Sequence, residues 1–165
     1  MPVNQHSTNS APVKLLLHIP VPWVFVLTYL FALIPLFLLP VRIHSEAALI
    51  IIKISGVVLF AIGAVFASWS LIIFNKTGTT TTPGESSKKL IISGPYKFSR
   101  NPMYVSLILA YLGEAGFLAQ VWPVLFLPLT IIYINTTVIP LEELILRDDF
   151  KEDYDIYLTR VRRWL

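Results

Sequence analysis

The residues best suited to chemistry fall in two short motifs. The first runs Gly94-Pro95-Tyr96-Lys97-Phe98-Ser99-Arg100-Asn101-Pro102-Met103-Tyr104, between two apolar runs. The second is the carboxylate pair Glu142-Glu143, where a later apolar run ends. Arginine and glutamate at the boundary of an apolar run are typical of a membrane protein that holds a polar ligand there. A guanidinium binds a carboxylate, and a carboxylate binds hydroxyls, an ammonium or a sulfonium, so the motifs together suit a zwitterion.

A plain ion pair is the alternative reading of these motifs. Pro102 fits the first turn of a helix that begins after Arg100, and the two glutamates follow the next apolar run. Adjacent residues on a helix point about 100° apart. One glutamate can therefore pair with Arg100 while the other faces a ligand, or the pair can simply tie two helix ends together.

The composition predicts an integral membrane protein. Of 165 residues, 55% are hydrophobic and only 14% are charged, whereas soluble domains average about 25% charged residues. The chain has no cysteine, which excludes disulfides, thiolate metal sites and cysteine nucleophiles. Its three histidines lie far apart, so we expect no metal site. No nucleic-acid partner is expected either.

Four apolar runs predict an all-α, multi-pass membrane helical bundle. They cover about residues 23–39, 47–74, 103–120 and 121–139. Pro35 should kink the first run. The second carries small residues at spacings of seven, four and three, where another helix can approach closely; these are Gly56, Gly63, Ala67 and Ser70. The third and fourth should form an antiparallel hairpin, because their connection is very short.

Polar segments flank this bundle. Residues 1–18 read as a flexible polar N-terminus, and residues 19–165 as a single membrane domain. From residue 141 a charged helix is expected, with an apolar stripe suited to an anionic membrane surface and Trp164 as anchor. The stripe comprises Tyr154, Tyr157, Leu158, Val161, Trp164 and Leu165.

Lysine and arginine predict the orientation. The loop 75–100 and the C-terminal tail carry ten of them, Lys14 adds one, and the opposite side has only Arg42. Both termini and the candidate site are therefore expected to be cytoplasmic. Lys53 and Glu114, inside the second and third spans, are expected to pair across helices. Asn135 is read as a hydrogen-bonding link between helices or as part of a polar pocket.

The motifs, taken in order, resemble one enzyme superfamily. Leu90-Ile91-Ile92-Ser93-Gly94-Pro95-Tyr96, Arg100-Asn101-Pro102-Met103-Tyr104, Glu142-Glu143 and the pattern from Phe150 through Tyr154 and Tyr157 to Arg163-Trp164 are similar to those of the isoprenylcysteine carboxyl methyltransferase / phospholipid methyltransferase superfamily. The similarity covers about residues 74–165. It implies an integral membrane enzyme that uses S-adenosylmethionine, with motifs for this cofactor in residues 88–104 and 138–164.

The resemblance also assigns residues. Those that would bind the cofactor are Lys88, Lys89, Leu90, Ile91, Tyr96, Asn101, Pro102, Met103, Tyr104 and Glu142. Arg100 and Glu143 are the candidate catalytic residues. Arg100 would orient the cofactor carboxylate or the glutamate pair, and Glu143 would accept a proton from an amine nucleophile or hold Arg100.

Two departures bear on the acceptor. Asn101 stands where the prenylcysteine enzymes have histidine, and asparagine cannot act as a base. Val138 stands where those enzymes carry an arginine thought to hold the substrate carboxylate. The expected reaction is therefore methyl transfer to a lipophilic acceptor from the bilayer, either a prenylcysteine-like carboxylate or a lipid amine or thiol. The alternatives are a sterol-reductase-like enzyme that uses NADPH and a membrane scaffold without catalysis.

Overall fold

The first apolar run folds as two helices end to end, α2 (Val21–Ala32) and α3 (Ile34–Leu38). In the computed structural model, which describes residues 20–41, 43–77 and 89–165, the break falls at Leu33. Pro35 has no N–H to donate to the carbonyl four residues before it, so the helix cannot continue unchanged. The kink predicted at Pro35 is confirmed. The N-terminus predicted for residues 1–18 lies outside the described residues.

The second run is one long helix, α4 (Glu46–Thr77). The Ser45 hydroxyl accepts a hydrogen bond from the Ala48 N–H at 3.3 Å and so caps its first turn. At 32 residues the helix is about 48 Å long, more than the roughly 30 Å of a bilayer core. Large apolar side chains such as Ile51, Ile54 and Val58 lie exposed along it, as expected of a surface that faces lipid.

Helix α4 packs closely against α5 (Pro102–Phe117). A Cβ added at Gly56 would overlap the backbone of α5 near Gly113 and Phe117, and one added at Gly63 would lie 2.9 Å from the Ser106 carbonyl oxygen. Such contacts require small residues, since any side chain would hold the backbones apart. The predicted small-residue face of α4 is confirmed, and α5 answers it with Gly113 and Gly116.

A substitution at this contact should loosen the pair. A Cβ at Gly113 would lie 2.5 Å from the Phe60 nitrogen, and a backbone atom cannot move aside cheaply. We expect Gly113→Ala to lower stability by about 1–3 kcal/mol despite the better helix propensity of alanine. Thermal unfolding in detergent measures this, with exposed Ser55→Ala on α4 as control. Equal melting temperatures for the two variants would contradict the close approach.

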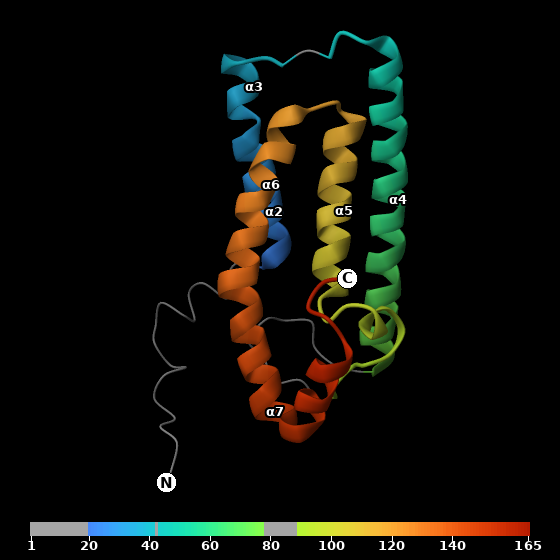
Figure 1. Ribbon diagram of the computed structural model, residues 1–165, viewed down its shortest axis with the longest axis vertical. Helices are drawn as coiled ribbons and strands as arrows, with labels where there is room; N and C mark the ends of the chain where they lie inside the picture. Colours follow the sequence, from blue (N-terminus) through green and yellow to red (C-terminus); the bar gives the residue numbers. More distant parts are fainter. Residues whose placement is uncertain (1–19, 42, 78–88) are drawn as a thin grey trace.

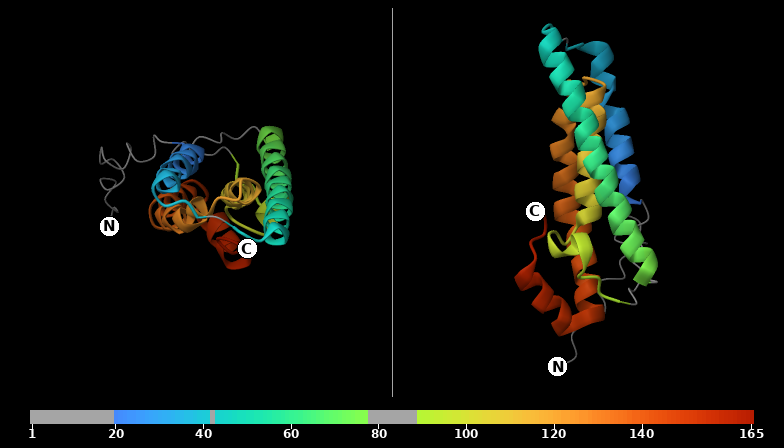
Figure 2. Two further views of the ribbon diagram at one scale, coloured as in Figure 1. Left: turned by 90° about the horizontal axis from the view of Figure 1, so that it is seen from above. Right: turned by 90° about the vertical axis from the view of Figure 1, so that its right-hand side faces the viewer.

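A tight turn joins α5 to α6 (Val121–Tyr133). Ala119 adopts a left-handed φ of 53°, and the Gln120 N–H donates to the Ala115 carbonyl at 2.8 Å, closing the end of α5. The two helices run antiparallel, which confirms the predicted hairpin (Figure 1). Seen along the bundle, α5 lies between α4 on one side and α2 and α6 on the other (Figure 2).

The fourth run continues far beyond its apolar part. After α6 come the π-helical turn η2 (Ile134–Val138) and α7 (Ile139–Arg160). Inside α7, Lys151 has φ 46° and ψ −118°, and there the chain reverses. The last residues consequently return toward the start of α5, and the C-terminus ends beside the bundle (Figures 1 and 2).

The architecture is an all-α membrane bundle, as the sequence predicted. Among the residues that the structure describes, three helical stretches are long and apolar enough to cross a membrane: Val21–Leu38, Glu46–Lys76 and Val121–Arg160. The third expected span is α5, which has only 16 residues, or about 24 Å. The 94–104 motif, the start of α7 and the C-terminal residues lie at one end of the bundle (Figure 1). The two chemical motifs therefore share a face, although which side of the membrane it faces stays a prediction.

Candidate functional site

A single 3₁₀ turn, η1 (Gly94–Lys97), presents the first motif. Gly94 has φ +61°, and a Cβ there would overlap the Ile73 side chain and lie 3.1 Å from the Trp69 indole nitrogen. Only glycine combines this backbone conformation with so little space. Pro95 and Tyr96 are buried behind it, and the Tyr96 ring contacts the Phe74 ring edge-on. The turn is thereby fixed against the end of α4.

The centre of the site is an ion cluster of Arg100, Glu143 and Arg163. Glu143 Oε1 lies 3.1 Å from Arg100 Nη1, and its Oε2 lies 2.6 Å from Arg163 Nη2. Arg163 Nε also donates to Oε1 at 3.1 Å, so this second arginine grips the carboxylate with two parallel bonds. The predicted Arg100–Glu pair exists, and Glu143 is the glutamate that makes it.

Glu142 points elsewhere. Its Oε1 accepts a hydrogen bond of 2.6 Å from the hydroxyl of Tyr104, which lies in the first turn of α5. The two adjacent carboxylates therefore face different partners, as the 100° step of a helix requires. Glu142 contacts no arginine among the salt bridges of the described residues. It is the carboxylate of the pair that can serve a ligand.

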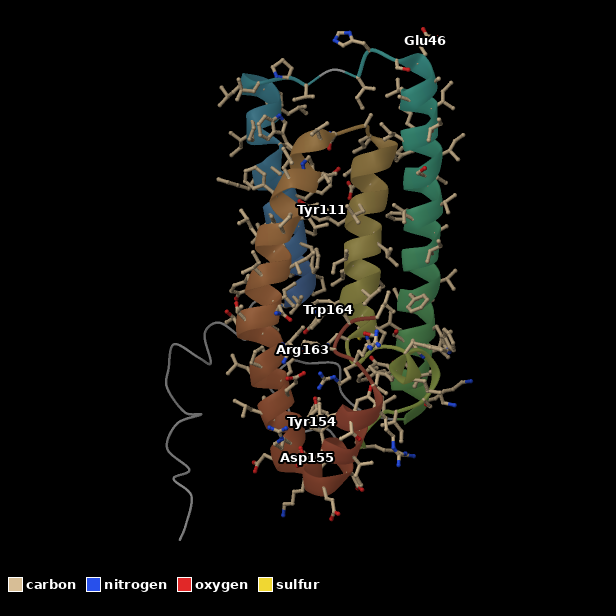
Figure 3. The ribbon with its side chains drawn as sticks, in the orientation of Figure 1. Glu46, Tyr111, Tyr154, Asp155, Arg163 and Trp164 are labelled. Carbon is tan, nitrogen blue, oxygen red and sulfur yellow. The ribbon has the colours of Figure 1, made fainter. Side chains whose placement is uncertain are left out.

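The residues after α7 are bonded into this site. The Arg162 carbonyl accepts from the Arg100 N–H at 2.9 Å. The Arg163 carbonyl accepts from Asn101 Nδ2 at 2.9 Å and from the Ser99 hydroxyl at 3.3 Å. Residues 161–165 thus run along the beginning of α5, and we call them the C-terminal strap. In Figure 3, Arg163 and Trp164 lie between α7 and α5.

The π-helical turn η2 contacts the C-terminal strap through Asn135. Asn135 Oδ1 accepts from Arg163 Nη1 at 3.3 Å and from Trp164 Nε1 at 3.2 Å. The Asn135 carbonyl lies 3.5 Å from the same guanidinium nitrogen. In a π-helix that carbonyl would bond the N–H five residues on, but this residue is Pro140, which has none. The proline therefore leaves an acceptor free for Arg163.

The apolar stripe of the tail faces the protein. Tyr154 and Tyr157 are 2% and 6% exposed, and the Tyr157 hydroxyl donates to the Tyr96 carbonyl at 2.7 Å. Trp164 packs against the core. The expectation that this stripe rests on a membrane surface is wrong for these three residues, because the reversal at Lys151 turns them toward η1 and α5. Burial, together with nearby Tyr157 and Glu142, raises the pKa of the Tyr96 hydroxyl, which stays protonated at neutral pH.

Most of the predicted site residues meet here. The structure brings together Tyr96, Arg100, Asn101, Pro102, Tyr104, Glu142 and Glu143. Met103 is half-buried in the first turn of α5. Lys89, Leu90 and Ile91 precede η1, with Lys89 exposed and Ile91 buried. Lys88 lies outside the described residues.

Two expectations about polar residues in the spans need correction. Lys53 and Glu114 are both exposed and form no salt bridge in the described part of the chain. Asn135 does not link two membrane-spanning helices, because its side chain binds Arg163 and Trp164 of the strap. The sequence signal for this contact is the Arg163-Trp164 pair, which ends the pattern that begins at Phe150.

The site contains the kinds of groups that a zwitterionic ligand needs. Arg100 Nε is buried and has no hydrogen-bond partner among the described residues, and the Tyr154 side chain interacts with the same guanidinium. Glu142 and Tyr104 provide a carboxylate and a hydroxyl, which are bonded to each other. Within the described ranges, no group of three His, Asp or Glu side chains could hold a metal ion.

The fold and this site define a helical membrane protein with a polar site at one end of its bundle. Its residues 51–153, more than half of the chain, match the model of the family described as phospholipid methyltransferase. The chain belongs to this family, and it is a membrane methyltransferase. The match ends before the C-terminal strap. No curated protein and no solved structure matches the chain.

Proposed function

We propose that this protein transfers a methyl group from S-adenosylmethionine to a lipophilic acceptor that enters from the bilayer. The observation that carries the proposal is the pair Glu142–Tyr104 beside Arg100, whose buried Nε has no described partner. Acidic and basic groups thus lie together at the end of an apolar bundle, where a water-soluble zwitterion and a lipid can meet. The family assignment supports the reaction class.

The residues around the first motif would hold the cofactor. Arg100 would bind its carboxylate, and Glu142 would bind its ammonium or lie near its sulfonium. The segment through η1 into α5 would line the rest of the site; it contributes Lys88, Lys89, Leu90, Ile91, Tyr96, Asn101, Pro102, Met103 and Tyr104. The bound cofactor would supply an electrophilic methyl group, whose carbon–sulfur bond breaks as the acceptor's lone pair forms the new bond.

Positioning and exclusion of water would provide most of the catalysis. Arg100 acts through orientation. Glu143 was a candidate proton acceptor, but its two guanidinium partners favour the other role considered for it, which is to hold Arg100. Glu142 is then the better-placed carboxylate to take a proton from an amine nucleophile.

The acceptor is proposed to be a lipid amine rather than a carboxylate. Val138, which stands where the prenylcysteine enzymes carry an arginine, is 4% exposed and packs in the core. Arg100 and Arg163 both turn to Glu143. With Arg100 assigned to the cofactor carboxylate and Arg163 held by both oxygens of Glu143, neither arginine is left for an acceptor carboxylate, whereas an amine needs no such partner. The family's description as phospholipid methyltransferase supports the same class.

Calorimetric binding of S-adenosylhomocysteine to the detergent-purified protein tests the cofactor assignment. We expect saturable binding of this product analogue and none of NADPH. Binding of NADPH alone would indicate the reductase alternative. A folded sample that binds neither would favour the scaffold. A positive result would be followed by incubation with labelled S-adenosylmethionine and vesicles that contain phosphatidylethanolamine, with label in the lipid fraction as the readout.

A further inference from the structure

The C-terminal strap joins three separate parts of the site. Its backbone carbonyls hold Arg100 and Asn101 at the start of α5. Its Arg163 side chain holds Glu143 on α7, and its Trp164 side chain holds Asn135 in the π-helical turn. These bonds form one connected network, although the strap itself falls outside the segment matched by the family.

Arg163 has the most connections in this network. Its guanidinium grips both oxygens of Glu143 at 3.1 and 2.6 Å, and its third nitrogen reaches Asn135. Glu143 in turn contacts Arg100 at 3.1 Å. A fork with two bonds fixes the plane of the carboxylate, which a single point charge would not do. The orientation of Arg100 therefore depends on Arg163 through the shared carboxylate.

We propose that Arg163 is a positioning residue of the methyl-transfer site, and that the C-terminal strap completes the cofactor site by fixing Glu143, Arg100 and Asn101. The expected effect of Arg163 on cofactor affinity rests on the proposed function. The ordering of residues 98–104 by Arg163 is expected with or without a ligand.

The alternative is that Arg163 only ties the C-terminus to the bundle. Such a tie would contribute to stability, yet the affinity of the site would survive its loss once the protein is folded. Rescue by a small molecule distinguishes the two roles. A free guanidinium ion cannot reattach the C-terminus to the bundle. It can, however, bind in the space left between Glu143 and Asn135 and restore the affinity of the site.

The test compares Arg163→Ala and Arg163→Lys with Arg160→Ala, an exposed arginine three residues earlier. For Arg163→Ala we expect S-adenosylhomocysteine affinity to fall at least about tenfold, as for other partly buried charge pairs that lose one partner. Arg163→Lys should recover only part of the affinity, because lysine cannot form the fork. Arg160→Ala should bind as the wild type does. Guanidinium chloride at a non-denaturing concentration should raise the affinity of Arg163→Ala alone.

Hydrogen exchange without ligand separates this inference from the proposed function. Amides in residues 98–104 should exchange faster in Arg163→Ala than in Arg160→Ala, while α4 is unchanged. If the wild type fails to bind S-adenosylhomocysteine but this difference appears, the proposed function fails and the positioning role stands. If exchange in residues 98–104 is the same in both variants, the positioning role is overturned. Wild-type binding with undiminished affinity in folded Arg163→Ala would overturn it as well.

Discussion

Replacing Glu142 with alanine should strongly weaken S-adenosylhomocysteine binding in a protein that remains folded. The carboxylate accepts a 2.6 Å hydrogen bond from Tyr104 and is the glutamate of the pair not held by arginine. Removal of one charged partner from a largely desolvated contact costs about 2–5 kcal/mol, so affinity should fall by at least about 30-fold. Calorimetry measures the affinity, and the melting temperature in detergent shows whether the fold survives.

Two further variants make this result specific. Glu142→Gln keeps an acceptor for Tyr104 without the charge, and it should bind more weakly than wild type but better than Glu142→Ala. Glu152→Ala removes an exposed carboxylate from the same helix and should bind normally. An unchanged affinity in folded Glu142→Ala would refute the assignment of this residue to the cofactor.

Replacing Glu143 with glutamine should lower the stability of the folded protein. The substitution leaves Arg100 and Arg163 without their shared counter-charge, and these side chains are only 15% and 31% exposed. A fully buried pair that loses one partner costs about 3–5 kcal/mol. Since solvent screens these groups in part, we expect a loss of about 2 kcal/mol. Thermal unfolding in detergent, at low and at high salt, measures it.

The chain offers a matched control for this change. Arg147 and Asp155 pair at 2.8 Å, but both side chains are more than half exposed. Asp155→Asn should therefore change stability by less than about 0.5 kcal/mol. If Glu143→Gln and Asp155→Asn destabilise the protein equally, Glu143 is an ordinary surface partner and does not organise the site.

Much of the fold followed from the sequence because local rules decide it. Pro35 interrupts the first helix, and the glycines of the second meet α5, since both effects arise from sterics that a short stretch of sequence contains. The number of spans between the two motifs was enough to predict that both lie at the same end of the bundle (Figure 1).

The path of the tail could not be predicted in the same way. Tyr154 and Tyr157 recur with helical spacing, but periodicity shows only that they share a face. Whether that face meets lipid or protein depends on the reversal at Lys151, and a lysine with positive φ has no sequence signature. The same reversal brings Arg163 to Glu143, which explains why the sequence led to Arg100 and missed its second partner.

The sequence also could not decide which of the two glutamates pairs with Arg100. A helix step separates Glu142 from Glu143, but the rotation of α7 about its axis decides which one meets Arg100. That rotation depends on the π-helical turn, whose extra residue per turn rotates everything after it. Pro140 after a polar Asn-Thr-Thr segment is the local signal for such a turn.

Because the chain reverses at Lys151, the contact between Glu143 and Arg163 depends on the number of residues between them more than on their types. Glu143 and Arg163 are joined by two helical arms, so inserting or deleting one residue in either arm would rotate one partner about 100° away from the other. Most exposed side chains there, such as Glu152 and Asp153, can change freely. Natural variation in this stretch should therefore accumulate as substitutions, while insertions and deletions between residues 143 and 163 should be nearly absent.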